Sequence, residues 1–262
     1  MKQAILQHLP RNHPWAQRIQ FHDVLPSTNT YAKELARQSA PEGTVVIAGQ
    51  QTAGRGRLGR SFHSPRGTGL YLSLILRPDC PAQQLMHLTC ATAVATCEAL
   101  EQACGIRPQI KWINDLTLQG KKLGGILTEL VFGSDGNVSA AIIGIGINCR
   151  LAHIPEQIRG IACSLSDFTD KTDIASLAAA LITALEQMSR KLLAEPSAIM
   201  EAYRRSCITL GQQVRILSPS ETQTGPAHQV NDDGSMTVLL YNGQQKTVNA
   251  GEVSVRGLWD YI

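Results

Sequence analysis

Arginine and glycine alternate in residues 54–60 (GRGRLGR), which lie between two strand-like apolar runs at 44–48 and 70–76. A segment this rich in glycine loses much backbone entropy when it becomes ordered. Glycine lets backbone N–H groups approach a phosphate or carboxylate closely, and arginine adds a planar, permanently charged guanidinium. The segment therefore predicts a mobile loop that closes over an anionic ligand; an ordinary solvated basic loop is the alternative.

The same residues formally spell G-x-G-x-x-G, the pattern of a dinucleotide-binding turn. That turn requires a helix directly after the last glycine and an acidic residue about twenty positions later. Residues 61–69 are instead rich in turn formers, and no kinase motif follows them. The glycines thus predict a close approach of the backbone to a ligand without identifying a nucleotide.

Two further polar clusters could contribute to the same chemistry. Asn114 and Asp115 form a turn-like pair that could bind Mg²⁺ or orient an amine, and Lys122 starts a strand beside two glycines, from which it could reach a phosphate or carboxylate. Ser27, Thr28 and Asn29 could cap a helix or face a polar ligand at its N-terminus. Each cluster alone also fits an ordinary turn, strand edge or helix cap.

The elements that position these residues follow from hydrophobic periodicity and turn formers. We expect helices at 2–9, 30–40, 85–105, 174–194 and 197–207, and strands at 21–25, 44–48, 70–76, 109–112, 116–118, 121–131 and 140–149. The apolar run 140–149 is either a central strand or an edge strand at a dimer seam. After about residue 210, short strands at 212–217, 227–231, 236–241, 245–249 and 252–256 predict a small barrel. We therefore expect two domains, 1–209 and 210–262.

Composition limits the class of protein. The 262 residues are 43% hydrophobic with a formal net charge of +3, which is too small to indicate general nucleic-acid binding. Seven scattered cysteines form no C-x-x-C pair, and residues 1–18 lack a signal peptide, so we expect a cytoplasmic protein. The longest apolar stretch, 85–104, carries charged residues and predicts a core helix, with no membrane association.

Taken together, five motifs resemble those of biotin protein ligases in order and spacing: STN at 27–29, QTAGRGRLGR at 51–60, KWxND at 111–115, KKLGGIL at 121–127 and GIGIN at 144–148. The resemblance covers most of residues 21–150, and the tail resembles that family's C-terminal domain. It implies an α+β fold with a mixed, mainly antiparallel sheet packed with helices, like a class II synthetase, plus a small C-terminal SH3-like β-barrel.

The resemblance also implies a two-step reaction. Biotin's carboxylate attacks the α-phosphate of ATP with Mg²⁺ to give biotinyl-5′-AMP, and a lysine of a biotin carboxyl carrier protein, such as that of acetyl-CoA carboxylase, then takes the biotinyl group. The implied catalytic residues are Lys122, Arg57 and Asp115, with Asp115 also the implied Mg²⁺ ligand. The implied biotin-binding residues are Ser27, Thr28, Asn29, Gln51, Arg55, Gly56, Arg57, Lys122 and Gly125. The implied ATP- or adenylate-binding residues are Arg55, Arg57, Arg60, Phe62, Lys111, Asn114 and Asn148.

Two departures and three rival functions qualify this interpretation. Ile113 stands where many family members have proline, and about twenty residues precede the catalytic region, too few for the winged helix of the repressor type. We therefore expect a monomeric or homodimeric ligase that does not bind operator DNA. A lipoate or octanoate ligase or transferase of the same general fold is the nearest rival, followed by a non-catalytic ligand-binding protein and a nucleic-acid-binding protein.

Overall fold

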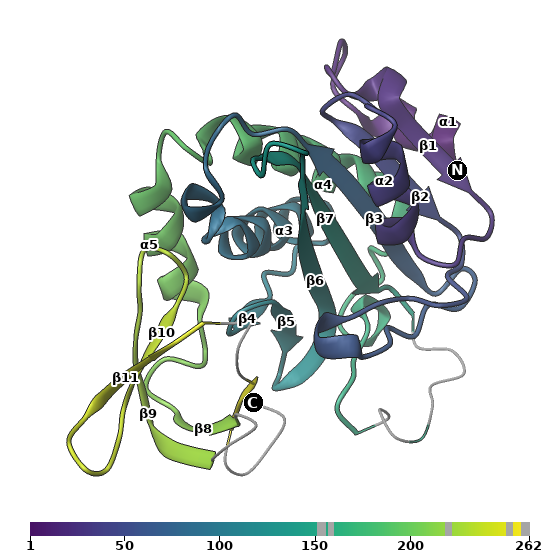
Figure 1. The fold of residues 1–262 in the computed structure, drawn as a ribbon. Helices are drawn as coiled ribbons and strands as arrows, with labels where there is room; N and C mark the ends of the chain where they lie inside the picture. Colours follow the sequence, from purple (N-terminus) through teal and green to yellow (C-terminus); the bar gives the residue numbers. More distant parts are fainter. Residues whose placement is uncertain (151–155, 157–159, 218–221, 250–253, 258–262) are drawn as a thin grey trace.

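The computed structural model describes residues 1–150, 156, 160–217, 222–249 and 254–257 (Figure 1). A seven-stranded sheet in the order β1-β2-β3-β7-β6-β5-β4 forms its centre. β1 and β2 run parallel, and all other neighbours are antiparallel. The strands are β1 (Ile19–His22), β2 (Thr44–Ala48), β3 (Gly69–Leu76), β4 (Gln109–Lys111), β5 (Asp115–Leu118), β6 (Lys121–Phe132) and β7 (Val138–Asn148).

Helices cover both faces of this sheet. On one face, α2 (Thr28–Arg37) packs Ala32 and Ala36 against Val46 of β2 and Ile142 of β7. The larger core lies on the other face, under α1 (Lys2–His8), α3 (Leu88–Cys104) and α4 (Ile174–Lys191). The mixed α+β architecture expected from the sequence is confirmed.

β7 lies between β3 and β6, so the apolar run 140–149 forms a central strand and not an edge strand. Its alternate residues contribute to opposite cores, with Ile142 on the α2 side and Ile143 on the other. Burial on both faces explains why this strand lacks a polar alternation.

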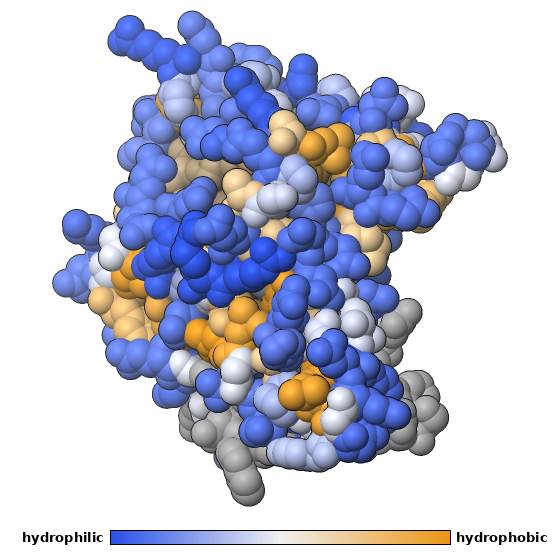
Figure 2. All heavy atoms as spheres, turned by 90° about the vertical axis from the view of Figure 1, so that its left-hand side faces the viewer, coloured by the Kyte–Doolittle hydropathy of each residue, from blue (hydrophilic) through white to orange (hydrophobic). Residues whose placement is uncertain are grey.

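A second, five-stranded antiparallel sheet follows α5 (Pro196–Ser206) in the order β11-β10-β9-β8-β12. Its strands are β8 (Gln213–Leu217), β9 (Thr222–Val230), β10 (Met236–Leu239), β11 (Gln245–Val248) and β12 (Ser254–Gly257). This arrangement agrees with the small C-terminal β-domain expected from the sequence. The face of the molecule in Figure 2 is largely hydrophilic, with separate apolar patches and no continuous apolar surface.

Several element boundaries differ from expectation; for example, α2 runs from Thr28 to Arg37 and not over 30–40, and β9 begins at Thr222 and not at 227. The first strand lies at Ile19–His22 because it pairs with β2, whereas Leu25 forms only an isolated bridge with Gln51. A short 3₁₀ helix at Ala82–Leu85 precedes α3, which therefore begins later than expected. Residues 252 and 253 of the last expected strand lie outside the described residues. No helix in the described ranges is both long and apolar enough to cross a membrane.

Candidate active site

A cavity of about 520 Å³ opens where the N-terminus of α2, the glycine- and arginine-rich loop, β6 and β7 meet. Every residue proposed for the site from sequence lines it: Ser27, Thr28, Asn29, Gln51, Arg55, Gly56, Arg57, Arg60, Phe62, Lys111, Asn114, Asp115, Lys122, Gly125 and Asn148. These residues come from five separate segments of the chain, so the fold brings all the predicted clusters to one place. Their individual roles remain predictions.

Uncharged donors and acceptors line the α2 end of the cavity. Ser27 has an extended backbone and caps α2, its hydroxyl accepting from the backbone N–H of Thr30 at 3.4 Å. The Gln51 side-chain carbonyl accepts from the Thr28 N–H at 2.8 Å and lies 3.1 Å from the Thr28 hydroxyl. The Gln51 amide then donates to the Ser64 hydroxyl at 2.9 Å. This network fixes the direction in which each polar group points.

Asn29 is the most tightly held of these side chains. Its carbonyl oxygen lies 2.7 Å from the Ser73 hydroxyl, and its amide nitrogen lies 3.2 Å from the Leu127 carbonyl and 3.1 Å from a Glu129 carboxylate oxygen. Gly144 lies directly against it, because a Cβ at that position would stand 2.1 Å from the Asn29 carbonyl oxygen. The GIGIN motif therefore includes a glycine that the packing of Asn29 requires.

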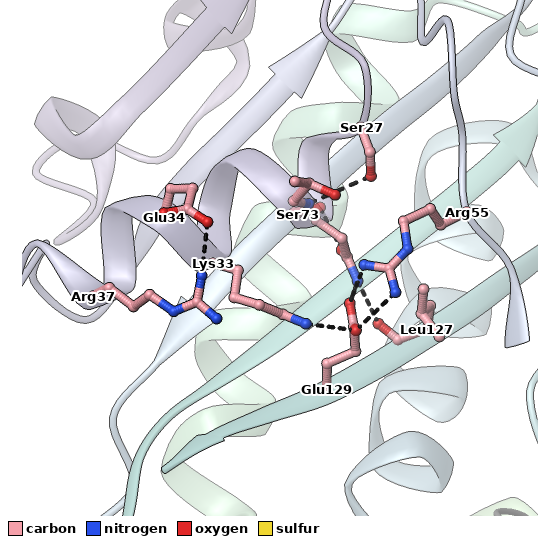
Figure 3. Close-up of polar contacts among 10 residues, drawn as sticks. Ser27, Lys33, Glu34, Arg37, Arg55, Ser73, Leu127 and Glu129 are labelled. Atoms are coloured by element: carbon pink, nitrogen blue, oxygen red, sulfur yellow. Dashed lines mark hydrogen bonds and ion pairs between the residues drawn. The ribbon is translucent and has the colours of Figure 1, made fainter. Parts of the chain in front are cut away.

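The loop is folded onto the cavity in this structure and carries its arginines in different directions. Arg55 forks onto Glu129 of β6 through two N–H···O contacts of 3.2 and 3.3 Å (Figure 3). Arg57 donates to the Asn114 side-chain carbonyl at 2.9 Å, and burial lowers the pKa of its guanidinium, although the Asp115 charge opposes that shift. Leu58, at the loop tip, has φ 54° and is 58% exposed.

The third side of the cavity carries an ion pair. The Lys122 ammonium lies 2.6 Å from an Asp115 carboxylate oxygen, and both side chains are largely buried. Gly125 packs beside them, since a Cβ there would come within 3.5 Å of both charged groups. Asn114 donates to the Ile126 carbonyl at 2.9 Å, which fixes the turn that holds Arg57.

One aromatic residue, Phe62, and one polar residue, Asn148, complete the cavity wall. The Phe62 ring covers Gly146, where a Cβ would stand 2.5 Å from the ring, and it meets Tyr71 edge-on with centroids 6.4 Å apart. Asn148 donates to the Cys163 carbonyl at 3.1 Å. Phe62 thus lies on the wall of the cavity, as does Asn148, and both are among the residues that the resemblance implies for ATP or adenylate binding.

The charge of the described lining is strongly unbalanced. One lining residue, Asp115, is acidic, and six are basic: Arg55, Arg57, Arg60, Lys111, Lys122 and Arg215. A concave site with this imbalance attracts anions and strengthens their binding where water is partly excluded. The arrangement fits a ligand with one uncharged polar end and one highly anionic end.

Comparison with known proteins is consistent with this geometry. Residues 21–148 match the Biotin/lipoate A/B protein ligase family, and residues 209–256 match the Biotin protein ligase C terminal domain. The chain is 39% identical over 238 residues to the Bifunctional ligase/repressor BirA of Bacillus subtilis, covering 89% of this chain and 73% of that protein. The chain belongs to the biotin protein ligase family.

Further relatives support this membership. The chain is 31% identical to the Biotin–[acetyl-CoA-carboxylase] ligase of Mycobacterium tuberculosis, covering 88% of this chain and 87% of that ligase. It is also similar to the structure of the biotin protein ligase from Aquifex aeolicus in complex with biotin and ATP, with a TM-score of 0.76, 30% identity, and coverage of 91% and 98%.

Sequence reasoning missed several residues that shape the site of this biotin ligase family member. Ser64, Ser73 and Glu129 support the polar network from outside the motifs, and Arg215 reaches the cavity from the C-terminal sheet. For Glu129 the sequence did contain one indication. Side chains two residues apart in a strand share a face, so Glu129 lies on the same face of β6 as Leu127 and Gly125. No local signal pointed to Arg215, which depends on how the two sheets pack.

Proposed function

We propose that this protein activates biotin as biotinyl-5′-AMP with ATP and transfers the biotinyl group to a lysine of a biotin carboxyl carrier protein. The observation that best supports this proposal is that one cavity has an uncharged polar end and a cationic end. Biotin's ureido ring needs donors and acceptors without charge, whereas its carboxylate and the phosphates of ATP need cations. Family membership and the family's structures with biotin and ATP support the same function.

In the first step, a biotin carboxylate oxygen forms a bond to the α-phosphorus while the bond to pyrophosphate breaks. The carboxylate is already ionised near neutral pH, so the protein needs no general base and contributes positioning and charge neutralisation. Lys122 and Arg57 are our proposed catalytic residues for this step, because both line the cavity and contact adjacent residues, Asp115 and Asn114. Arg55, Arg60, Lys111 and Asn148 are proposed to bind the adenylate with them, and Phe62 to pack against adenine.

In the second step, the amine of the carrier lysine attacks the acyl carbon and AMP leaves. That amine must first lose a proton from a group whose pKa is about 10.4 in water. Asp115 is the single acidic residue among those that line the cavity in the described part of the chain, so we propose that it orients the amine.

Asp115 is also the proposed protein ligand for Mg²⁺, which usually binds through one or two carboxylates together with substrate phosphates and water. A single carboxylate facing a cavity lined by six basic residues fits that donor set, and the described residues hold no cluster of three or more acidic, histidine or cysteine side chains. When bound, the metal would neutralise phosphate charge. Asp115 would then exchange part of its contact with Lys122 for the metal.

The oxidation state of the cysteines bears on the cellular compartment, and the strand order bears on the oligomeric state. All seven cysteines are free thiols and six are buried, which supports a reducing compartment, and we propose the cytoplasm. The central position of β7 removes the dimer seam that this strand could have formed. We keep both a monomer and a homodimer as proposals for the oligomeric state.

The Gly144→Ala variant should bind biotin at least tenfold more weakly, a change that corresponds to about 1.4 kcal/mol. The new methyl group would stand 2.1 Å from the Asn29 carbonyl, and Asn29 is held on three sides, so the amide must leave its position. Titration calorimetry with biotin measures the effect. Gly160→Ala is the control, because a Cβ there meets open space, and an equal loss in both variants would disprove the proposed role of Asn29.

Trp112 joins the proposed catalytic turn to the C-terminal sheet. We propose a division into domains 1–209 and 210–262, and across it the Trp112 indole donates to the buried Gly234 carbonyl at 2.9 Å. Trp112→Phe leaves that carbonyl unpaired, which costs about 1–3 kcal/mol, so the variant should have a lower melting temperature and a raised KM for ATP. Tyr241→Phe, which loses one exposed contact to Gln213 inside the sheet, is the control. An unchanged KM for ATP in Trp112→Phe would show that the turn does not depend on this contact.

Mass spectrometry of a carrier domain after incubation with the protein, biotin and MgATP tests the proposed function. The expected result is one added biotinyl group on one lysine, with AMP and pyrophosphate as products. Lipoate in place of biotin tests the rival ligase, which the match of residues 209–256 to the biotin ligase C-terminal domain disfavours. AMP formation with lipoate and none with biotin would overturn the proposal.

A further inference from the structure

Glu129 lies behind the cavity wall and contacts groups from two other segments, α2 and the loop. It is on β6, its side chain is 16% exposed, and it is not among the residues that line the cavity. One carboxylate oxygen lies 2.7 Å from the Lys33 ammonium of α2 and 3.2 Å from Arg55 (Figure 3). The other lies 3.1 Å from the Asn29 amide and 3.3 Å from Arg55. A single carboxylate thus joins α2, the loop and β6.

The surroundings of this carboxylate favour its charged form. Burial alone would raise the pKa of Glu129, but the hydrogen bonds from Lys33 and Asn29 and the charges of Lys33 and Arg55 outweigh it and lower the pKa. A charged acceptor makes stronger hydrogen bonds than a neutral one, and a forked arginine contact also fixes orientation. The Glu129 carboxylate is mostly buried, whereas both partners of an ion pair on α2, Glu34 with Arg37, are exposed (Figure 3).

Two of the three partners face the cavity. Asn29 and Arg55 line it, whereas Lys33 does not. The Asn29 amide has two N–H groups, and Glu129 and the Leu127 carbonyl accept them, so the side-chain carbonyl must point toward Ser73. Arg55 is 46% exposed and lies on a glycine-rich loop, so its position depends on the partner that holds it.

We infer that Glu129 is a positioning residue for biotin: it holds Asn29 and Arg55 in one fixed relation, so that the uncharged end of the cavity and the first arginine of the loop are ready for the same ligand. The inference rests on the proposed function and assigns a role to a residue that touches no substrate. Its consequence is a lower entropic cost of ordering the loop when biotin binds. Arg55 is also among the residues proposed to bind ATP or the adenylate, but others of that set, such as Arg57 and Asn114, contact each other away from Glu129. ATP binding should therefore depend on Glu129 less than biotin binding does.

Glu129→Gln tests the inference because it keeps the shape of the side chain and removes its charge. We expect KM for biotin to rise about tenfold, in line with the loss of one charge-assisted contact, while KM for ATP and kcat at saturating biotin change little. Pyrophosphate release measures all three quantities. Glu34→Gln, which removes an exposed carboxylate paired with Arg37 on α2, is the matched control and should leave them unchanged.

A double-mutant cycle with Arg55→Ala separates positioning from general stability. In the Arg55→Ala background, Glu129→Gln should have a much smaller effect on KM for biotin, since one of its two cavity-facing partners is gone. Additive effects, an unchanged KM for biotin, or a fall in kcat alone would each overturn the inference. If Glu129→Gln does not fold, Glu129→Asp keeps the charge with a shorter reach and should show the same selective rise in KM. Absence of pyrophosphate release in the parent protein would instead refute the proposed function.

Discussion

Replacing Lys122 with alanine should slow biotinyl-5′-AMP formation by about 10²–10³-fold, the usual effect of removing one group that stabilises developing charge. Lys122 is the cation that Asp115 holds at 2.6 Å beside the backbone of Gly125, where no side chain separates it from the cavity. An ammonium in this place meets charge that builds up between the carboxylate and the α-phosphate. Its contribution is therefore greatest in the transition state.

Single-turnover measurement of adenylate formation, together with calorimetric titration of biotin, separates the two effects. The affinity for biotin should fall much less than the rate. Lys121→Ala is the matched control, because Lys121 is the preceding residue of β6 and is exposed. Equal losses of affinity and rate in Lys122→Ala would show that Lys122 binds the ground state and the transition state alike, and would contradict its catalytic role.

The pairing of Lys122 with Asp115 shows where sequence reasoning stops. Both residues were identified from their motifs, and the strands that hold them were expected at nearly the observed positions. Their contact, however, depends on the register of β5 and β6, which shifts between Leu116 and Thr117. A one-residue shift reverses the face to which a strand side chain points, and no local pattern specifies that shift.

Structural features that depend only on neighbouring residues in the chain were predictable from the sequence. The strand Thr44–Ala48 has the expected bounds because it is β-branched and bounded by glycines, and Ser27 caps α2 because its hydroxyl can accept an N–H of the first turn. Gly105 ends α3 in the left-handed conformation, at φ 72°, as a glycine in that position predicts. These features require only neighbours in the chain.

Supporting residues were not predictable for the opposite reason. Glu129 lies 100 positions from Asn29 and 74 from Arg55, and in sequence it is one of several polar residues in β6. Its importance arises only when α2, the loop and β6 meet. Arg215 likewise reaches the cavity only through the packing of the C-terminal sheet.

Replacing Arg57 with alanine should leave the fold intact but speed the loss of biotinyl-5′-AMP from the enzyme by about 100-fold, which corresponds to about 2.7 kcal/mol of lost binding. Arg57 is held by the Asn114 carbonyl at 2.9 Å, and Asn114 is fixed in turn on the Ile126 carbonyl. The Arg57 guanidinium is therefore held in place at the cationic end of the cavity, although the backbone of Arg57 belongs to the loop. An acyl phosphate that loses this contact also loses protection from water, since the loop is the part of the wall that must close over it.

Retention of radiolabelled biotinyl-5′-AMP through a rapid desalting column measures this loss without the carrier protein. Arg66→Ala is the matched control, because Arg66 follows the same loop, is 60% exposed and pairs only loosely with Asp23 at 3.8 Å. Its adenylate should dissociate at the parent rate, since an exposed pair of this kind contributes little. Should Arg57→Ala hold the adenylate as long as the parent does, the loop would not act as a clamp. The cationic lining would then have to act on the nucleotide before the bond forms, through Lys122 and Lys111 from the sheet side of the cavity.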